Sequence, residues 1–149
     1  MTVGTPFYFY DMKLLRQTVA AARAAAANPM FRIHYAMKAN VEVPVLEVMR
    51  EAGFGIDTVS GGEISRAVDC GFNPARIVFA GVGKSDAEID LAIEKGIGCF
   101  NVESIEELEV IAGRARALGK KARVALRVNP NIDAHTHHYI TTGLAENKF

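Results

Sequence analysis

Strand-like and helix-like segments alternate regularly along this chain, and this alternation constrains its fold more than any other feature. Between the strand-like segments, apolar residues recur at helical spacing, as with Leu108, Ile111 and Ala115. The strand-like segments are short apolar stretches whose starts lie about 21–25 residues apart: 33–37, 56–59, 77–80, 98–102 and 122–128. Their near-continuous apolar character is typical of parallel strands that are covered on both faces. The alternation therefore predicts a parallel sheet built from βα units.

The expected helix boundaries support the same fold. Three Ser-x-x-Glu segments follow predicted strands, and each is typical of a capping box: Ser60 with Glu63, Ser85 with Glu88, and Ser104 with Glu107. Four glycines stand where the helical stretches end, as left-handed caps do: Gly53, Gly71, Gly96 and Gly119. The predicted α/β fold is a doubly wound open sheet or part of a (β/α)8 TIM-type barrel. Such a barrel normally needs about 250 residues, so only about the first five βα units would be present.

Composition excludes several classes of function. Lys and Arg together number 17, as do Asp and Glu, so the net charge of zero gives no electrostatic footprint for nucleic acid or an anionic membrane. No apolar run approaches the roughly 20 residues of a membrane span, and the first residues do not resemble a secretory signal. We expect a cytoplasmic protein in which Cys70 and Cys99 are reduced packing residues.

Lys38 is the first candidate for chemistry. On the predicted first strand, His34, Ala36 and Lys38 share one face, which places Lys38 at the carboxyl end of that strand. A partly desolvated lysine there can lose its proton and form a Schiff base with an aldehyde. On position alone, a solvated lysine at a strand end explains the residue equally simply.

Asp57 and Arg127 also lie on predicted strands. An unpaired carboxylate at Asp57 would be costly to bury, unless the residue lies at a strand end in water. Arg127 shares a strand face with Arg123 and Ala125, and an arginine that points into a barrel must meet an anion or a network of acceptors. A site residue and an interior structural ion pair are both open for Arg127.

Two other motifs favour ordinary explanations. His135, His137 and His138 cluster, but no Cys or carboxylate follows at ligand spacing, so we expect no metal site there. The stretch 81–85 suggests a phosphate loop, but that motif requires a glycine where this chain has Val78. We expect Lys84 to be a loop residue at the barrel mouth.

The segment YAMKAN at residues 35–40 resembles the Schiff-base lysine motif of the fold-type III pyridoxal-phosphate (PLP) decarboxylases. The resemblance continues in order along the chain through TPFYFYD, GIDTVSGGE, FAGVGKS, FNVES, RVNPNIDAHTHHYITTG and the terminal NKF. Within that class, the HTHHYITTG stretch and the terminal KF are more similar to the diaminopimelate decarboxylases than to the ornithine or arginine decarboxylases.

The resemblance implies a cofactor and a set of residues around it. Lys38 would bind PLP as a Schiff base, with Asp57, Glu63 and Arg127 near the cofactor. Asp57 would pair with a histidine that this chain does not reach, and the capping box explains Glu63 without any contact with the cofactor. The resemblance also implies a short strand segment at 1–10 that pairs outside the barrel and a partial PLP-binding α/β barrel at 11–149. The phosphate-binding loops and a C-terminal β-domain are absent from this sequence.

The function implied for the complete protein is decarboxylation of meso-diaminopimelate to L-lysine and CO2 by a cytoplasmic homodimer. The alternatives are a related decarboxylase that acts on ornithine, arginine or carboxynorspermidine, or a relative that binds PLP or a partner without catalysis. Because a half barrel has unpaired edge strands, we expect the isolated 149-residue chain to be inactive and to associate.

Overall fold

The computed structural model describes residues 4–129, which form one parallel sheet with helices between its strands. The strands are β1 (His34–Ala36), β2 (Gly55–Thr58), β3 (Ile77–Phe79), β4 (Cys99–Val102) and β5 (Val124–Leu126). The helices are α1 (Met12–Ala25), α2 (Val43–Glu51), α3 (Gly61–Asp69), α4 (Asp86–Lys95) and α5 (Ile105–Ala117), with two short 3-10 helices, η1 (Met37–Ala39) and η2 (Pro74–Arg76).

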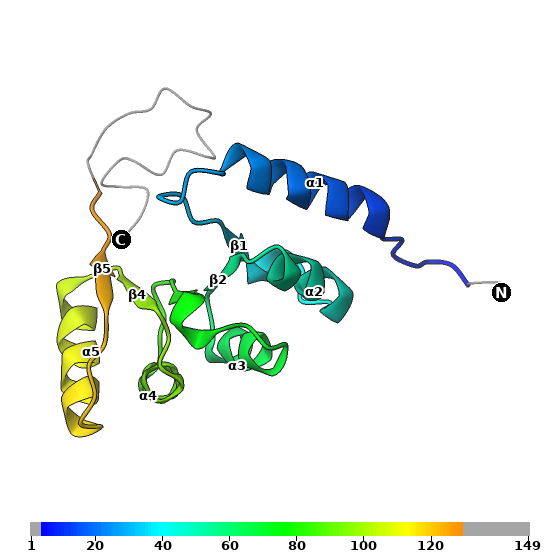
Figure 1. Ribbon diagram of the computed structural model, residues 1–149. Helices are drawn as coiled ribbons and strands as arrows, with labels where there is room; N and C mark the ends of the chain where they lie inside the picture. The colour runs from blue at the N-terminus through cyan, green and yellow to red at the C-terminus, as the bar shows by residue number, and fades with distance from the viewer. Residues whose placement is uncertain (1–3, 130–149) are drawn as a thin grey trace.

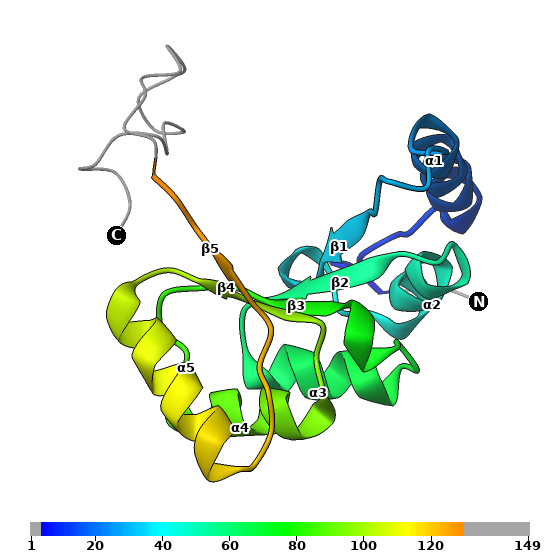
Figure 2. The same ribbon diagram turned by 60° about the vertical axis from the view of Figure 1, so that its left-hand side comes forward.

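The five strands are hydrogen-bonded in the order β1-β2-β3-β4-β5, so each pairs with its neighbours in sequence (Figure 1). Helices α3, α4 and α5 lie together on one side of the sheet (Figure 2). A doubly wound sheet would reverse its strand order and carry helices on both faces. The barrel-type α/β fold is therefore confirmed over the described residues. These contain four complete βα units and a fifth strand, whereas the sequence predicted five units.

The two faces of the sheet differ in burial. The in-register residues Thr58, Phe79 and Phe100 face the helices and are completely buried or nearly so. On the opposite face, the row that contains Ala36 and Asp57 remains only half-buried. We call this second face the open face; it carries the polar side chains described below.

Apolar side chains from the helices fill the space behind the sheet. Ile64 of α3, Ile89 of α4 and Ile111 of α5 are all fully buried and belong to one core cluster. Each such side chain contributes roughly 1.5–3 kcal/mol to stability. The core thus anchors the helices on one face and leaves the open face to be shaped by the loops.

All three predicted serine caps form. Ser60, Ser85 and Ser104 each accept a hydrogen bond from the backbone N–H three residues later. The reciprocal bond of a complete capping box forms only at α4, where Glu88 accepts from the N–H of Ser85 at 3.0 Å. The other two glutamates accept from the residue before the serine: Glu63 from Val59 at 2.7 Å and Glu107 from Glu103 at 2.8 Å. The four glycines predicted to end helices all have positive φ.

Two predicted segments differ in the structure. The first strand ends at Ala36 rather than at residue 37, because the chain turns into η1 and buries Met37 completely. Residues 7–10 form no strand, and Tyr8 and Phe9 are largely exposed. The pairing of this segment outside the barrel stays a prediction. None of the helices within residues 4–129 is long and apolar enough to cross a bilayer.

Candidate functional site

Lys38 lies directly after β1, at the carboxyl end of the sheet, and its side chain is exposed. It belongs to the single turn of η1 rather than to the strand, so the predicted strand alternation does not extend to it. The turn is held at both ends: Asn40 donates its N–H to the carbonyl of Met37 at 3.2 Å, and the Tyr35 hydroxyl donates to the carbonyl of Asn40 at 3.1 Å. The backbone of Lys38 is therefore fixed while its amine reaches solvent.

Asp57 lies on the neighbouring strand β2, in register with Ala36. Burial raises the pKa of the Asp57 carboxyl, and the charges of Lys38 and His34 oppose part of that rise. The structure thus brings Lys38 and Asp57 close enough to interact electrostatically, as expected if both belong to one site.

His34 lies beneath this pair on the open face, and it depends on the glycine beside it. A Cβ built on Gly55 would lie 2.5 Å from Cε1 of His34 and 2.7 Å from the carbonyl oxygen of Arg76. The ring nitrogen Nδ1 of His34 lies 3.4 Å from the carbonyl oxygen of Ile56. The absence of a side chain at Gly55 therefore makes the room that His34 occupies.

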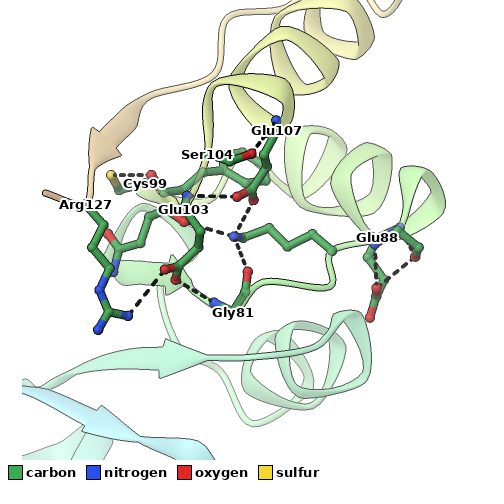
Figure 3. Close-up of polar contacts among 11 residues, drawn as sticks. Gly81, Glu88, Cys99, Glu103, Ser104, Glu107 and Arg127 are labelled. Atoms are coloured by element: carbon green, nitrogen blue, oxygen red, sulfur yellow. Dashed lines mark hydrogen bonds and ion pairs between the residues drawn. The ribbon is translucent and has the colours of Figure 1, made fainter. Parts of the chain in front are cut away.

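Arg127 lies just beyond β5 and forms an ion pair with Glu103, with Nη1 3.3 Å from Oε2 (Figure 3). The side chain of Glu103 is only 4% exposed, and its Oε1 accepts a hydrogen bond from the N–H of Gly81 at 3.2 Å. The structural ion pair that the sequence left open is thus present. Contact of Arg127 with a cofactor stays a prediction.

A hollow of about 290 Å³ lies in front of this ion pair. Glu103 and Arg127 line it together with three residues from β3, β4 and β5 or their ends, and with Leu126: Ala80, Asn101 and Ala125. The hollow gives a small molecule access to the Arg127 side chain.

Glu63 serves as a cap, as its motif predicts. Its Oε2 accepts from the N–H of Val59 at 2.7 Å, while its own N–H donates to Oγ of Ser60 at 3.2 Å. These bonds account for the residue at the start of α3. The structure does not test the cofactor contact that the resemblance implies.

Lys84 differs most from its sequence-based expectation of a loop residue at the barrel mouth. Its side chain is 1% exposed, and Nζ donates to the carbonyls of Gly81 at 2.6 Å and Asn101 at 2.9 Å and to Oε1 of Glu107. The ammonium also lies 5.5 Å from the centre of the Phe79 ring. No local motif signals this arrangement, because two of the three acceptors come from β4 and α5, far along the chain.

The three clustered histidines, His135, His137 and His138, lie outside the described residues. Within residues 4–129, no group of three His, Cys, Asp or Glu side chains is arranged to hold a metal ion. The expectation for the histidine cluster stays a prediction.

Comparison with known proteins gives consistent matches. Residues 13–149 match the family described as pyridoxal-dependent decarboxylase, pyridoxal binding domain. Diaminopimelate decarboxylase from Bacteroides thetaiotaomicron is 58% identical over 99% of this chain and 39% of its own length. The Helicobacter pylori diaminopimelate decarboxylase of strain J99 is 48% identical over 99% of this chain and 36% of its own length.

Solved structures agree with the sequence matches. A crystal structure of diaminopimelate decarboxylase from Helicobacter pylori complexed with L-lysine superposes with a TM-score of 0.89 and 47% identity, and covers 99% of this chain and 38% of that one. The corresponding enzyme from M. jannaschii gives a TM-score of 0.75 and 37% identity over 93% of this chain and 32% of that one. This chain thus spans less than two fifths of the length of these relatives.

Proposed function

This chain belongs to the pyridoxal-dependent decarboxylase family through its pyridoxal-binding domain, and from this membership we propose that the complete protein converts meso-diaminopimelate to L-lysine and CO2. The observation that carries the proposal is the 58% identity to a diaminopimelate decarboxylase over 99% of this chain. Relatives of other substrate class are more distant: a viral arginine decarboxylase shares 22% identity and supports only the fold.

The residues present fit pyridoxal phosphate, the cofactor of this family. The cofactor carries an aldehyde, which needs a primary amine, and Lys38 offers an exposed amine at the carboxyl end of β1. It also carries an anionic phosphate, which favours a cationic rim such as that formed by Lys38 and Arg127. In the proposal, Lys38 holds the aldehyde, and Asp57, Glu63 and Arg127 lie around the cofactor.

The chain's own residues would position and hold protons. When bound, pyridoxal phosphate supplies an electron-withdrawing ring that takes up the electron pair released as CO2 leaves. Lys38 gives up its hold on the aldehyde to the amine of the substrate, and its Nζ can then hold a proton beside the reacting carbon. The carboxylate of Asp57 orients and stabilises the ammonium form of Lys38. A cytoplasmic homodimer with shared active sites completes the proposal.

The test uses the complete gene product with Lys38→Ala and, as a matched control, Lys13→Ala on the exposed surface of α1. We expect the parent protein and the Lys13 variant to release CO2 from meso-diaminopimelate and the Lys38 variant to lose this activity. Borohydride reduction of the cofactor-loaded protein should attach the pyridoxyl group to Lys38. Labelling of another lysine would contradict the site assignment.

The same preparation separates the alternatives. Faster CO2 release from ornithine, arginine or carboxynorspermidine would replace the substrate in the proposal. Cofactor binding without CO2 release from any of these compounds would indicate a non-catalytic relative. Gel filtration at several concentrations measures whether the complete protein is a dimer.

A further inference from the structure

A chain of hydrogen bonds crosses the carboxyl end of the sheet from the start of α5 to β5. Glu107 accepts from the ammonium of Lys84, which also donates to the carbonyl of Gly81 at 2.6 Å. Gly81 then donates its N–H to Oε1 of Glu103 at 3.2 Å, and Oε2 of Glu103 pairs with Arg127 at 3.3 Å. Figure 3 shows Glu103 between Gly81 and Arg127.

The position of Glu103 is fixed from two directions. Its backbone N–H donates to Oε2 of Glu107 at 2.8 Å, which fixes the main chain. The N–H of Gly81, where φ is +105°, fixes one oxygen of the side chain. Only the second carboxylate oxygen faces the end of β5, so the geometry specifies which oxygen Arg127 meets.

Burial makes this carboxylate dependent on Arg127. A carboxylate that is 4% exposed has lost most of its hydration and must be compensated by charge and hydrogen bonds. The guanidinium of Arg127, which is 37% exposed, reaches this carboxylate and at the same time borders the hollow of about 290 Å³ on the open face. The pair therefore has a buried anchor and an accessible cation.

We propose that Glu103 is a positioning residue, which holds the guanidinium of Arg127 at the edge of this hollow so that Arg127 meets the anionic cofactor in a defined orientation. The inference rests on the proposed function, since it assigns Arg127 to the cofactor side. Glu103 itself touches neither cofactor nor substrate and acts through Arg127.

The experiment is a double-mutant cycle on the complete gene product with Glu103→Gln, Arg127→Met and the double variant. The dissociation constant of pyridoxal phosphate is measured from the visible absorption of the bound cofactor. Each single variant should raise this constant about tenfold, the loss expected from one charge-assisted hydrogen bond. The double variant should also lose about tenfold, because both changes disable the same contact. Glu109→Gln, an exposed glutamate on α5, should leave the constant unchanged.

Two further readouts separate positioning from stability or direct charge. Circular dichroism shows whether each variant is folded, and Glu103→Asp keeps the charge but shortens the reach by one methylene. We expect Glu103→Asp to lose about threefold, and to lose nothing more in the Arg127→Met background. A direct charge effect would shift the pH at which the visible absorption changes in opposite directions in Glu103→Gln and Arg127→Met, whereas positioning shifts it in the same direction.

The possible outcomes are distinct. A loss of about a hundredfold in the double variant, or opposite pH shifts, would overturn the role of Glu103 while the proposed function stands. A parent protein that takes up no pyridoxal phosphate would overturn the proposed function itself, and this inference with it.

Discussion

At the scale of single residues, two lysines with similar positions have opposite environments. Lys38 and Lys84 both follow strands of the sheet, yet Lys38 is exposed and Lys84 is 1% exposed with three acceptors. A buried ammonium is tolerated only when its partners replace water, and here Glu107 supplies the compensating charge.

Lys84→Met therefore leaves the carboxylate of Glu107 without its cation. We expect the free energy of unfolding of the complete gene product to fall by about 3 kcal/mol, measured by urea denaturation. Lys84→Arg should not restore stability, because the planar guanidinium does not fit the site of a compact ammonium. Lys95→Met, at the exposed end of α4, should change the free energy by less than about 0.5 kcal/mol. Equal effects at Lys84 and Lys95 would contradict the structural role of Lys84.

The sequence predicted individual residues only where a local motif exists. Lys38 stands within a recognisable segment, and the structure brings it near Asp57 as the resemblance implies. The partners of Lys84 and the pairing of Glu103 with Arg127 join residues that are 17 to 24 positions apart. Such contacts depend on how loops from different βα units meet, which no single segment encodes.

At the scale of secondary-structure elements, Glu88 links two helices at their starts. Its Oε2 completes the capping box of α4 with Ser85, and its Oε1 accepts from the N–H of Gly61 at 2.8 Å at the first residue of α3. The side chain passes so close to α3 that a Cβ on Gly61 would lie 2.8 Å from its Cγ. The hydrogen bonds from Gly61 and then Ser85 hold the pKa of Glu88 below its ordinary value of 4.5.

Glu88→Gln should lower stability by about 1 kcal/mol at neutral pH, because the amide cannot accept both charge-assisted bonds. A lowered pKa means that the stabilisation by Glu88 is present above pH 4.5 and disappears as the pH falls through the folded-state pKa. The difference in thermal midpoint between the parent protein and the variant should therefore shrink in acid. Glu47→Gln, exposed on α2, is the control and should show no such pH dependence. A difference that persists unchanged in acid would contradict this account.

Elements were predictable wherever capping chemistry and apolar periodicity agreed. The serine caps before α3, α4 and α5 and the glycine ends were confirmed, because both depend on neighbouring backbone groups. Strand lengths were predicted less well: β5 spans Val124–Leu126 rather than 122–128. Apolar character continues past the last ladder hydrogen bond, so it marks a strand without fixing its ends.

At the scale of the whole molecule, the described residues form a sheet with one covered face and one open face. Strands β1 and β5 each have a strand partner on one side only within the described part of the chain. Val124, Leu126 and Val128 at the β5 edge are exposed. Unpaired strand edges with apolar side chains favour association.

We therefore expect the isolated 149-residue chain to form oligomers or aggregates in light scattering and to release no CO2 from meso-diaminopimelate. The complete gene product at the same concentration is the control and should have a defined mass and activity. A monomeric, active 149-residue chain would show that the open face and edges need no cover.

The overall architecture was the most predictable level, since regular alternation of strands and helices leaves few topologies. What the sequence left open was the choice between a doubly wound sheet and a barrel. That choice depends on whether successive strands add at one edge or at both, and the spacing of segments is the same in either case.

The sequential strand order has a consequence for how this domain is made. Since every strand after β1 pairs with the strand synthesised just before it, each βα unit finds its docking surface already in place when it leaves the ribosome. The sheet can thus be assembled in the direction of translation, one unit at a time, without waiting for distant parts of the chain.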